Sequence, residues 1–277
     1  MNVLSIQSQV VYGHVGNSAA AFVLQRQGHA VWQVPTVLFS NHLGKPTFRG
    51  RDVPAEQARD LIEGLKELGY LDDVDMLLTG YLGTPDTARL AAELARLIRA
   101  QNPKAIFACD PVMGDDDELY VKPDLADTIA EELIQAADVL LPNVFELGRL
   151  TGRIVKDEAS ALDAARALQD QTGVKLVIAT GVPTSSIDRI AALALTGKDV
   201  HRAEAARRKL RVSGTGDTFS ALFNGHYVTS RDAAKSLDFA MKAMEVICTA
   251  TSEADADELL IVQTQNQWAE VGSRKSG

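Results

Sequence analysis

A short run in the last third of the chain, SGTGDTFSA (residues 213–221), combines residue types that suit acid–base chemistry beside an anion. Two glycines flank Thr215, Asp217 follows, and small apolar residues begin directly after them. A glycine turn that opens a helix leaves backbone N–H groups without partners, and together with the helix dipole they favour an anion. A carboxylate beside such a site could act as a general base. Alone the run is a weak signal, because glycine turns with an aspartate cap are common.

A second candidate is DPVMGD (residues 110–115), which follows an apolar stretch predicted to be a strand. At the end of that strand, Asp110 could hold a hydrated divalent metal or face a phosphate. Asp-Pro and Gly-Asp are also turn dipeptides, so an ordinary turn is an equally good interpretation.

A third candidate is PNVFE (residues 142–146), which follows another apolar stretch and opens a short helix that ends at residues 151–152. Asn143 and Glu146 could form a capping pair, which would be a complete structural explanation. Alternatively, Glu146 is an outer-sphere metal ligand that faces the same cleft as Asp110 and Asp217. Three such carboxylates would repel one another unless a cation compensated their charge.

The elements that must position these residues alternate between short apolar strands and helices. Strands are predicted at residues 3–8, 30–37, 76–81, 105–110, 139–142, 175–180 and 190–196. Helices are predicted at residues 55–68, 84–99, 125–136, 158–171, 215–229, 231–251 and 255–271, with another beginning near Asn17. This pattern predicts an α/β fold, a three-layer α/β/α sandwich with a mostly parallel central sheet, in a single domain over residues 1–277.

Polar residues recur where the predicted strands end. Ser8, Tyr81, Asp110, Asn143 and Thr180 each lie at or just after the end of a strand. Ligands of open parallel sheets bind at the carboxyl ends of the strands, so these residues are expected to share one site.

Composition narrows the classes of partner. A net charge of −9 and a pI near 5.1 argue against nucleic acid as the main partner. There is no stretch of transmembrane length and no signal-peptide pattern, so no membrane association is expected and the cytoplasm is the default location. Cys109 and Cys248 are expected to be reduced thiols rather than a disulfide. The basic cluster at residues 207–211 is expected to be mostly solvated, although a triphosphate in the cleft would benefit from one or two of its members.

Six motifs in order resemble the pyridoxal kinases of the ribokinase superfamily. They are IQSQVVYGHVGN (6–17), VLFSNHLG (37–44), LLTGYLG (77–83), CDPVMGD (109–115), LPNVFELGRLTG (141–152) and SGTGDTFSA (213–221). The first two are specific to that branch, whereas DPVMG and GTGD are shared with hydroxymethylpyrimidine kinases and related sugar kinases. The resemblance covers almost the whole chain and implies a ribokinase-like fold.

The resemblance also implies an activity, the ATP-dependent phosphorylation of the 5′-hydroxymethyl group of pyridoxal, and of pyridoxine or pyridoxamine, in vitamin B6 salvage. By this resemblance Asp217 is the catalytic base, and Gly214, Thr215 and Gly216 form the anion hole for the γ-phosphoryl group. Asp110 and Glu146 organise Mg²⁺, and a monovalent cation requirement stays open.

The resemblance further implies the binding residues and the assembly. The vitamer contacts are Ser8, Val15, His42, Leu43, Gly44, Tyr81 and Asp217. The ATP contacts are Asp110, Leu141, Asn143, Glu146, Thr180, Lys209, Gly214 and Gly216. A mobile lid loop is expected at about residues 40–50, and a homodimer is expected because this branch pairs through one face of its sheet region.

The lid departs from the family pattern. After FSNH the family continues Thr-Gly-Tyr and, later, Trp, whereas this chain has Leu43, Gly44 and Lys45, followed by Phe48. A threonine hydroxyl that would contact the vitamer is missing, which puts vitamer affinity in question but not phosphoryl transfer. Two alternatives stay open: a hydroxymethylpyrimidine kinase, and a non-catalytic vitamer-binding protein on the same scaffold. The latter would need none of Asp110, Glu146 and Asp217.

Overall fold

A computed structural model describes residues 1–115 and 118–271 of the chain. Most of the strands belong to one sheet, and β6 and β7 form a separate small hairpin. The strands are β1 (Asn2–Val10), β2 (Ala30–Phe39), β3 (Gly50–Asp52), β4 (Met76–Thr79), β5 (Ile106–Cys109), β6 (Gly114–Asp115), β7 (Glu118–Leu119), β8 (Val139–Leu140), β9 (Leu176–Pro183), β10 (Arg189–Thr196) and β11 (Asp199–Ala206).

The helices fall between the strands, as the alternating pattern predicts. The α-helices are α1 (Asn17–Arg26), α2 (Ala55–Glu67), α3 (Pro85–Gln101), α4 (Pro123–Thr128), α5 (Val144–Thr151), α6 (Glu158–Thr172), α7 (Thr215–Ser230), α8 (Ala233–Glu253) and α9 (Gln265–Ala269). A 3₁₀ turn, η1 (Tyr70–Asp73), precedes β4, and a π turn, η2 (Ile129–Leu133), and a 3₁₀ turn, η3 (Ile134–Ala136), follow α4.

The main sheet has nine strands in the order β11-β10-β9-β8-β5-β4-β1-β2-β3. The pairs from β2 through β1, β4, β5 and β8 to β9 are parallel. The outer pairs β2–β3, β9–β10 and β10–β11 are antiparallel. The prediction of a mostly parallel sheet is therefore confirmed, with antiparallel strands at both edges.

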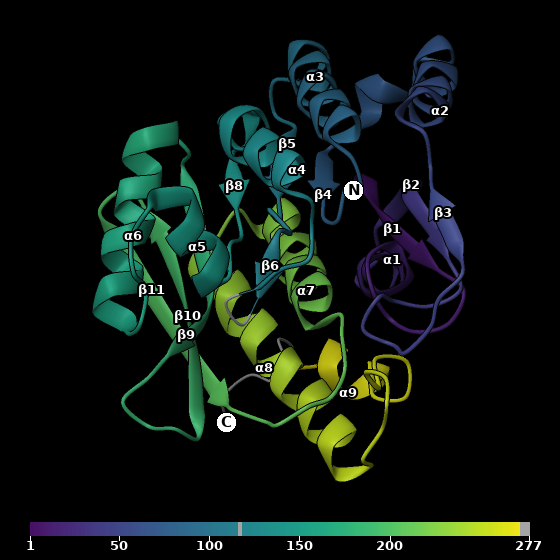
Figure 1. Cartoon of the computed structure of the whole chain (residues 1–277). Helices are drawn as coiled ribbons and strands as arrows, with labels where there is room; N and C mark the ends of the chain where they lie inside the picture. The colour runs from purple at the N-terminus through teal and green to yellow at the C-terminus, as the bar shows by residue number, and fades with distance from the viewer. Residues whose placement is uncertain (116–117, 272–277) are drawn as a thin grey trace.

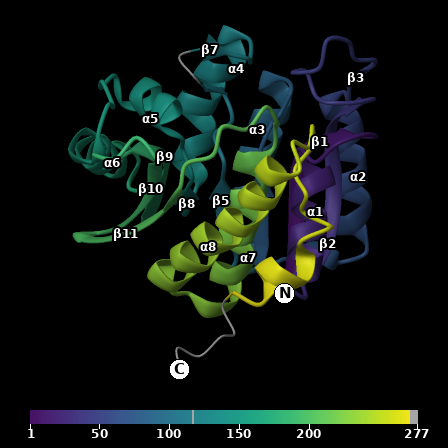
Figure 2. The same cartoon turned by 90° about the horizontal axis from the view of Figure 1, so that it is seen from below.

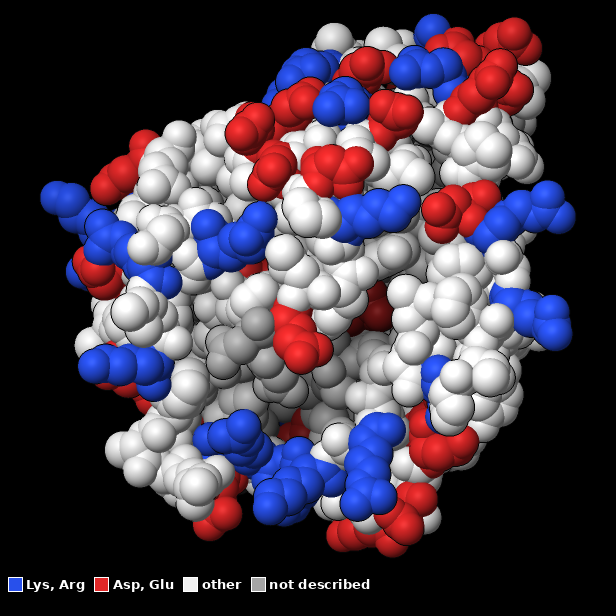
Figure 3. All heavy atoms as spheres, in the orientation of Figure 1, with Lys and Arg blue, Asp and Glu red and all other residues white. Residues whose placement is uncertain are grey.

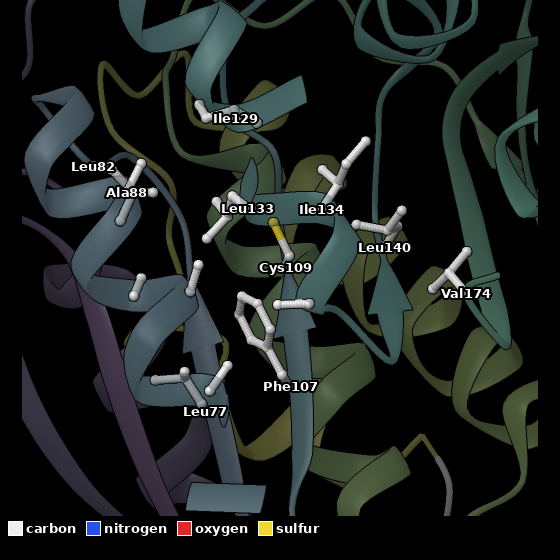
Figure 4. Packing of buried hydrophobic residues seen from close by; sticks show 14 of the residues in the cluster. Leu77, Leu82, Ala88, Phe107, Cys109, Ile129, Leu133, Ile134, Leu140 and Val174 are labelled. Atoms are coloured by element: carbon white, nitrogen blue, oxygen red, sulfur yellow. The ribbon is translucent and has the colours of Figure 1, made fainter. Parts of the chain in front are cut away.

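Helices cover both faces of this sheet, which gives the predicted three layers (Figures 1 and 2). Along each strand, successive side chains enter opposite cores. Leu78 and Ala108 pack with helices α1, α7 and α8, whereas Leu77 and Phe107 pack with helices α2, α3, α4 and α6. Figure 4 shows the second core, with Cys109 buried among its aliphatic side chains.

The predicted helix at residues 255–271 is wrong. Helix α8 ends at Glu253, and Asp255 adopts a left-handed conformation with φ of 46°, which breaks the helix. Of the predicted stretch only α9 is helical. The residues before α9 form turns and bends instead, with Leu259 and Ile261 fully buried. Tertiary packing therefore overrides the local helix propensity of this stretch.

Other differences concern the sheet edges and one helix. The sequence pattern missed β11, because only one of its faces packs against the protein and charged residues occupy the other. It also missed the short β3, which extends the edge beside β2. The predicted helix at 125–136 is helical throughout, but it changes from α to π to 3₁₀ geometry along its length.

Candidate active site

A cleft of about 1400 Å³ opens at the carboxyl edge of the parallel strands. Figure 3 shows a hollow on this face, with carboxylate atoms in its depth and Lys and Arg side chains around it. Nearly all of the residues predicted for the site line it. They are Ser8, Val15, His42, Leu43, Gly44, Tyr81, Asp110, Leu141, Asn143, Glu146, Thr180, Gly214, Thr215, Gly216 and Asp217.

Lys209 is the exception among the predicted residues, since it is exposed and is not part of the cleft lining. Its neighbours Arg207 and Arg208 do line the cleft. The basic cluster therefore contributes these two arginines to the cleft lining instead of Lys209. The wall beside them comes from α8 and includes Met241, Met244 and Cys248, which sequence reasoning did not assign to the site.

Helix α7 begins inside the cleft. Its N-cap is Gly214, with a left-handed φ of 90°, and its first helical hydrogen bond runs from the Thr218 N–H to the Gly214 carbonyl. The N–H groups of Thr215, Gly216 and Asp217 therefore have no partner within the helix ladder. A Cβ atom at Gly214 would lie 1.8 Å from the His14 carbonyl oxygen, so only glycine fits there. The turn is suited to an anion.

Asp217 lies in the first turn of α7 and is half-buried. Burial raises the pKa of its carboxyl, although a hydrogen bond from the backbone N–H of Gly16 lowers it in part. That bond also joins the catalytic turn to the N-terminal glycine loop (residues 13–16). Asp217 thus combines a fixed position with raised basicity, which are the properties needed in a general base.

Asp110 is 7% exposed and follows β5, as the sequence predicted. Burial is the main reason that its pKa lies well above the ordinary value, and the charges of Glu146 and Asp217 raise it further. A hydrogen bond from Ser220, on α7, works in the opposite direction. All three carboxylates line the same cleft. A cation between them would offset their repulsion.

Glu146 forms the capping box that the sequence offered as a structural interpretation. The Glu146 N–H donates to Asn143 Oδ1 at 2.8 Å, and the Asn143 N–H donates to Glu146 Oε2 at 2.9 Å. The other oxygen, Oε1, accepts from the Met113 N–H at 2.9 Å. Burial raises the pKa of Glu146 to about 8, opposed by these backbone N–H groups. Because both oxygens already accept backbone bonds, Glu146 is better placed to order water around a cation than to bind the cation directly.

The opposite end of the cleft is apolar. Val10, Val15, Val37 and Phe39 form a small buried cluster against which Tyr81 packs. Phe48, on the lid loop, has its ring centroid 5.0 Å from that of Phe39, but it is 46% exposed and lies outside the cleft lining. A flat ring could bind against this apolar wall.

Ser8 places a hydroxyl beside this apolar end. It belongs to β1 rather than following it, since β1 extends beyond its pairing with β4, which ends at Ile6. The register between β1 and β2 shifts between Gln7 and Gln9. A Cβ atom at Gly16 would lie 2.2 Å from Ser8 Oγ, so the glycine loop packs directly on this residue.

The other end is formed by the residues that follow β8 and by Thr180, which lies inside β9 rather than at the end of the predicted strand 175–180. Asn143 and Thr180 form an isolated parallel bridge, and the Thr180 N–H donates to the Pro142 carbonyl at 3.0 Å. The Asn143 side chain donates to the Gly114 carbonyl at 2.8 Å. These hydrogen bonds fix the polar residues Asn143 and Thr180 in the cleft lining. Among residues 1–115 and 118–271, no three His, Cys, Asp or Glu side chains are grouped so that they could hold a metal ion by themselves.

Comparison with known proteins decides between the families that share this geometry. The family model described as phosphomethylpyrimidine kinase matches residues 57–256. The pyridoxal kinase PdxY of Corynebacterium diphtheriae is 40% identical over 268 residues, which cover 96% of this chain and 94% of the relative. The chain belongs to the pyridoxal kinase family.

Further comparisons agree with this membership. The pyridoxal kinase PdxY of Deinococcus radiodurans is 38% identical and covers 96% of this chain and 92% of its own. The solved structure of the Leishmania donovani pyridoxal kinase, in complex with ADP and pyridoxine, superposes with a TM-score of 0.89 at 32% identity. That match covers 96% of this chain and 95% of the other. The family and the ribokinase-like fold predicted from the motifs are therefore confirmed.

Sequence reasoning missed Glu258, which is only 8% exposed and contacts both the lid loop and the glycine loop. The residue lies in the stretch predicted as a helix, where a glutamate is unremarkable. No motif or spacing in the sequence marks it, and only the tertiary fold brings it to the site.

Proposed function

We propose that this chain is an ATP-dependent kinase that phosphorylates the 5′-hydroxymethyl group of pyridoxal, and of pyridoxine or pyridoxamine, in vitamin B6 salvage. The observation that carries this proposal is the position of Asp217 at the open N-terminus of α7, in one cleft with Asp110. Membership of the pyridoxal kinase family and the likeness to a pyridoxal kinase in complex with ADP and pyridoxine support it.

In this proposal Asp217 accepts the proton of the substrate hydroxyl as the oxygen attacks the γ-phosphorus of ATP, and the bond from that phosphorus to the β,γ-bridging oxygen breaks so that ADP leaves. The raised pKa of Asp217 makes it a better base than an exposed aspartate. The N–H groups of Thr215, Gly216 and Asp217 stabilise the charge on the transferring phosphoryl group, because they point where that charge develops. Gly214 permits the turn that exposes them.

Magnesium is proposed as the cofactor, and the residues present fit it. Mg²⁺ usually takes one or two carboxylates, several waters and the phosphates of its nucleotide, so it needs no all-protein cage. Asp110 supplies a buried carboxylate, and Glu146 is placed to order water. When bound, the ion would neutralise phosphate charge. Asn143, Thr180 and Leu141 are proposed to contact the nucleotide.

The vitamer is proposed to bind at the apolar end, with Ser8 contacting the pyridine and Tyr81, Val15 and His42 around it. Leu43 and Gly44 of the lid loop line the same end, and closing this loop would exclude water from the reactive phosphoryl group. A hydroxyl that would face the vitamer is replaced here by the aliphatic Leu43.

For the whole molecule we propose a single catalytic domain over residues 1–277, a homodimer and a cytoplasmic location. The continuous nine-stranded sheet supports the single domain. In the described part of the chain, no helix combines the length and apolar character needed to cross a bilayer.

The test is a phosphorylation assay with MgATP against pyridoxal, pyridoxine, pyridoxamine and hydroxymethylpyrimidine. We expect phosphorylation of pyridoxal with a kcat/KM well above that for hydroxymethylpyrimidine. Preference for hydroxymethylpyrimidine would support the alternative kinase, which the matching phosphomethylpyrimidine kinase model keeps in view. Binding of a vitamer without any phosphoryl transfer would support the non-catalytic alternative.

A further inference from the structure

The segment after α8 (residues 254–264, the C-terminal segment) is fixed against the core although it is not helical. Leu259 and Ile261 are fully buried, and the Leu260 N–H donates to Thr251 Oγ1 at 3.1 Å. Trp268 is also fully buried, and its indole N–H donates to the Ile261 carbonyl at 2.8 Å. A residue carried on this segment therefore has a defined position.

Glu258 lies on this segment, and its side chain is buried against the lid loop and the glycine loop. One oxygen, Oε1, lies 3.1 Å from Lys45 Nζ and 3.3 Å from His42 Nε2, both on the lid loop. The other, Oε2, accepts from the His14 backbone N–H at 3.2 Å. One carboxylate thus contacts the lid loop and the glycine loop at once, although both are more than 200 positions away in the sequence.

On the lid loop, His42 and Lys45 each make a further hydrogen bond besides their contact with Glu258. The Gly44 N–H donates to His42 Nδ1 at 3.2 Å, so the neutral ring carries its proton on Nε2. That nitrogen faces Glu258. Lys45 is held further by Asp257, through its carboxylate at 3.2 Å and its carbonyl at 3.0 Å. The His42 ring is therefore hydrogen-bonded within the lid loop through Nδ1, and its Nε2 lies 3.3 Å from the Glu258 carboxylate without a hydrogen bond.

The other side of the contact leads to the reacting groups. Glu258 Oε2 would lie 2.7 Å from a Cβ atom at Gly13, so the glycine loop packs directly on the carboxylate. The same loop places the His14 carbonyl against Gly214 and donates from the Gly16 N–H to Asp217. Glu258 thus contacts the lid loop directly and is one contact removed from the catalytic turn.

We propose that Glu258 is a positioning residue for the vitamer, holding His42 and the lid loop against the substrate end of the cleft. The inference rests on the proposed kinase function and assigns to the C-terminal segment a part in substrate binding. Glu258 touches no reacting atom. Glu258 acts through its contacts with His42 and Lys45. This role accounts for the burial of its carboxylate in the C-terminal segment, where no other charged residue is buried.

The test compares Glu258→Gln with wild type and with Glu253→Gln, a matched control at an exposed position just before the segment. The amide keeps the size of Glu258 and an acceptor for the His14 N–H, but it loses the charge that Lys45 and His42 face. We expect the KM for pyridoxal to rise roughly 10-fold, from the loss of charge-assisted bonds. The KM for ATP should change less than about twofold, and Glu253→Gln should match wild type in both.

A double-mutant cycle separates positioning from a general loss of structure. In the His42→Ala background, Glu258→Gln should add less to the pyridoxal KM than it does in wild type. Equal effects in both backgrounds, or an equal rise in the KM for ATP, would overturn the proposal. If Glu258→Gln does not fold, Lys45→Met tests the same contact from the lid, and an unchanged pyridoxal KM there would overturn it too.

The wild-type assay separates this inference from the function on which it rests. A wild-type protein that phosphorylates no vitamer would overturn the proposed function, and this inference with it. A wild-type protein that phosphorylates pyridoxal, together with a Glu258→Gln variant of unchanged pyridoxal KM, would overturn the inference alone.

Discussion

Asp110, Glu146 and Asp217 lie in one cleft, and burial raises the pKa of each of them. Their arrangement costs stability in the absence of a compensating cation, because buried like charges are poorly solvated and repel one another. At the scale of single residues, this cost supports the proposed binding of a cation in the cleft.

Replacing the proposed base tests the chemistry directly. Asp217→Asn keeps the shape of the side chain but removes its ability to accept the hydroxyl proton. We expect kcat to fall about 10²–10⁴-fold while the affinity for ATP stays within a factor of a few. Single-turnover rates and nucleotide binding by calorimetry measure the two effects. A variant that retains a near wild-type kcat would show that another group accepts the proton.

The two roles of Glu146 can be separated by a magnesium titration. Asp110→Ala and Glu146→Gln should each raise the Mg²⁺ concentration needed for half-maximal activity, by about 10-fold or more, since both are proposed to hold the ion or its waters. An unchanged titration curve for Glu146→Gln would leave only its capping role.

Individual site residues differed in how well the sequence revealed them. Asp110 and Asn143 were predictable because they follow apolar strands, and parallel strands bring those ends together, whereas Thr180 reaches the cleft from inside β9, which continues to Pro183. Glu258 was not, because its role depends on a long-range contact with Lys45 and His42. Lys209 was predicted to contact the nucleotide, but its neighbours Arg207 and Arg208 line the cleft instead. Side-chain direction in a loop cannot be inferred from composition.

At the scale of elements, the parallel strands and the long amphipathic helices were predictable because burial on two faces gives continuous apolar runs. The edges were harder. Strand β11 packs on one side only, and its exposed face carries charged residues such as Arg202 and Glu204 that pair with each other. The composition of the C-terminal segment predicts a helix, yet the segment forms turns and bends, with Leu259 and Ile261 buried in the core.

A substitution in the lid loop tests whether this loop faces the vitamer. Leu43 lines the cleft and is 41% exposed, so a new side chain there can reach a bound vitamer. Leu43→Thr should restore a hydrogen bond worth about 0.5–1.5 kcal/mol, which is roughly a two- to tenfold decrease in the KM for pyridoxal. The KM for ATP should be little changed. If Leu43→Thr alters the ATP value and leaves that of pyridoxal unaffected, the lid does not face the vitamer.

At the scale of the whole molecule, the carboxyl edge of the sheet and the helix pair α7 and α8 line one cleft, and Figures 1 and 2 show this helix pair lying against the sheet. Helix α7 packs between α1 and α8 and delivers its N-terminus to the carboxyl edge of the sheet. The carboxylates of Asp110, Glu146 and Asp217 lie in this cleft. We therefore expect their charges to affect the free energy of unfolding of the whole protein as well as its activity.

This coupling predicts how the ligand-free protein responds to pH. A carboxyl whose pKa is raised by folding binds its proton more tightly in the folded state, so its contribution is most favourable below the unfolded pKa and is lost as pH rises through the folded value. For Glu146 that window extends from the ordinary pKa of 4.5 to about 8, and Asp110 and Asp217 shift in the same direction. The free energy of unfolding should therefore fall between pH 5 and 8.

Within the window each such group changes the free energy of unfolding by at most about 1.4 kcal/mol per pH unit, and each kcal/mol shifts the melting temperature by about 2–4 °C. Melting curves without ligand should thus shift to lower temperature from pH 5 to pH 8. Asp110→Asn should flatten this trend and raise the melting temperature at pH 8, whereas Asp60→Asn, at an exposed position on α2, should change neither. MgATP should flatten it as well, because the cation offsets the repulsion. A wild-type melting temperature that is constant or rises with pH would show that the three carboxylates do not carry this shared cost.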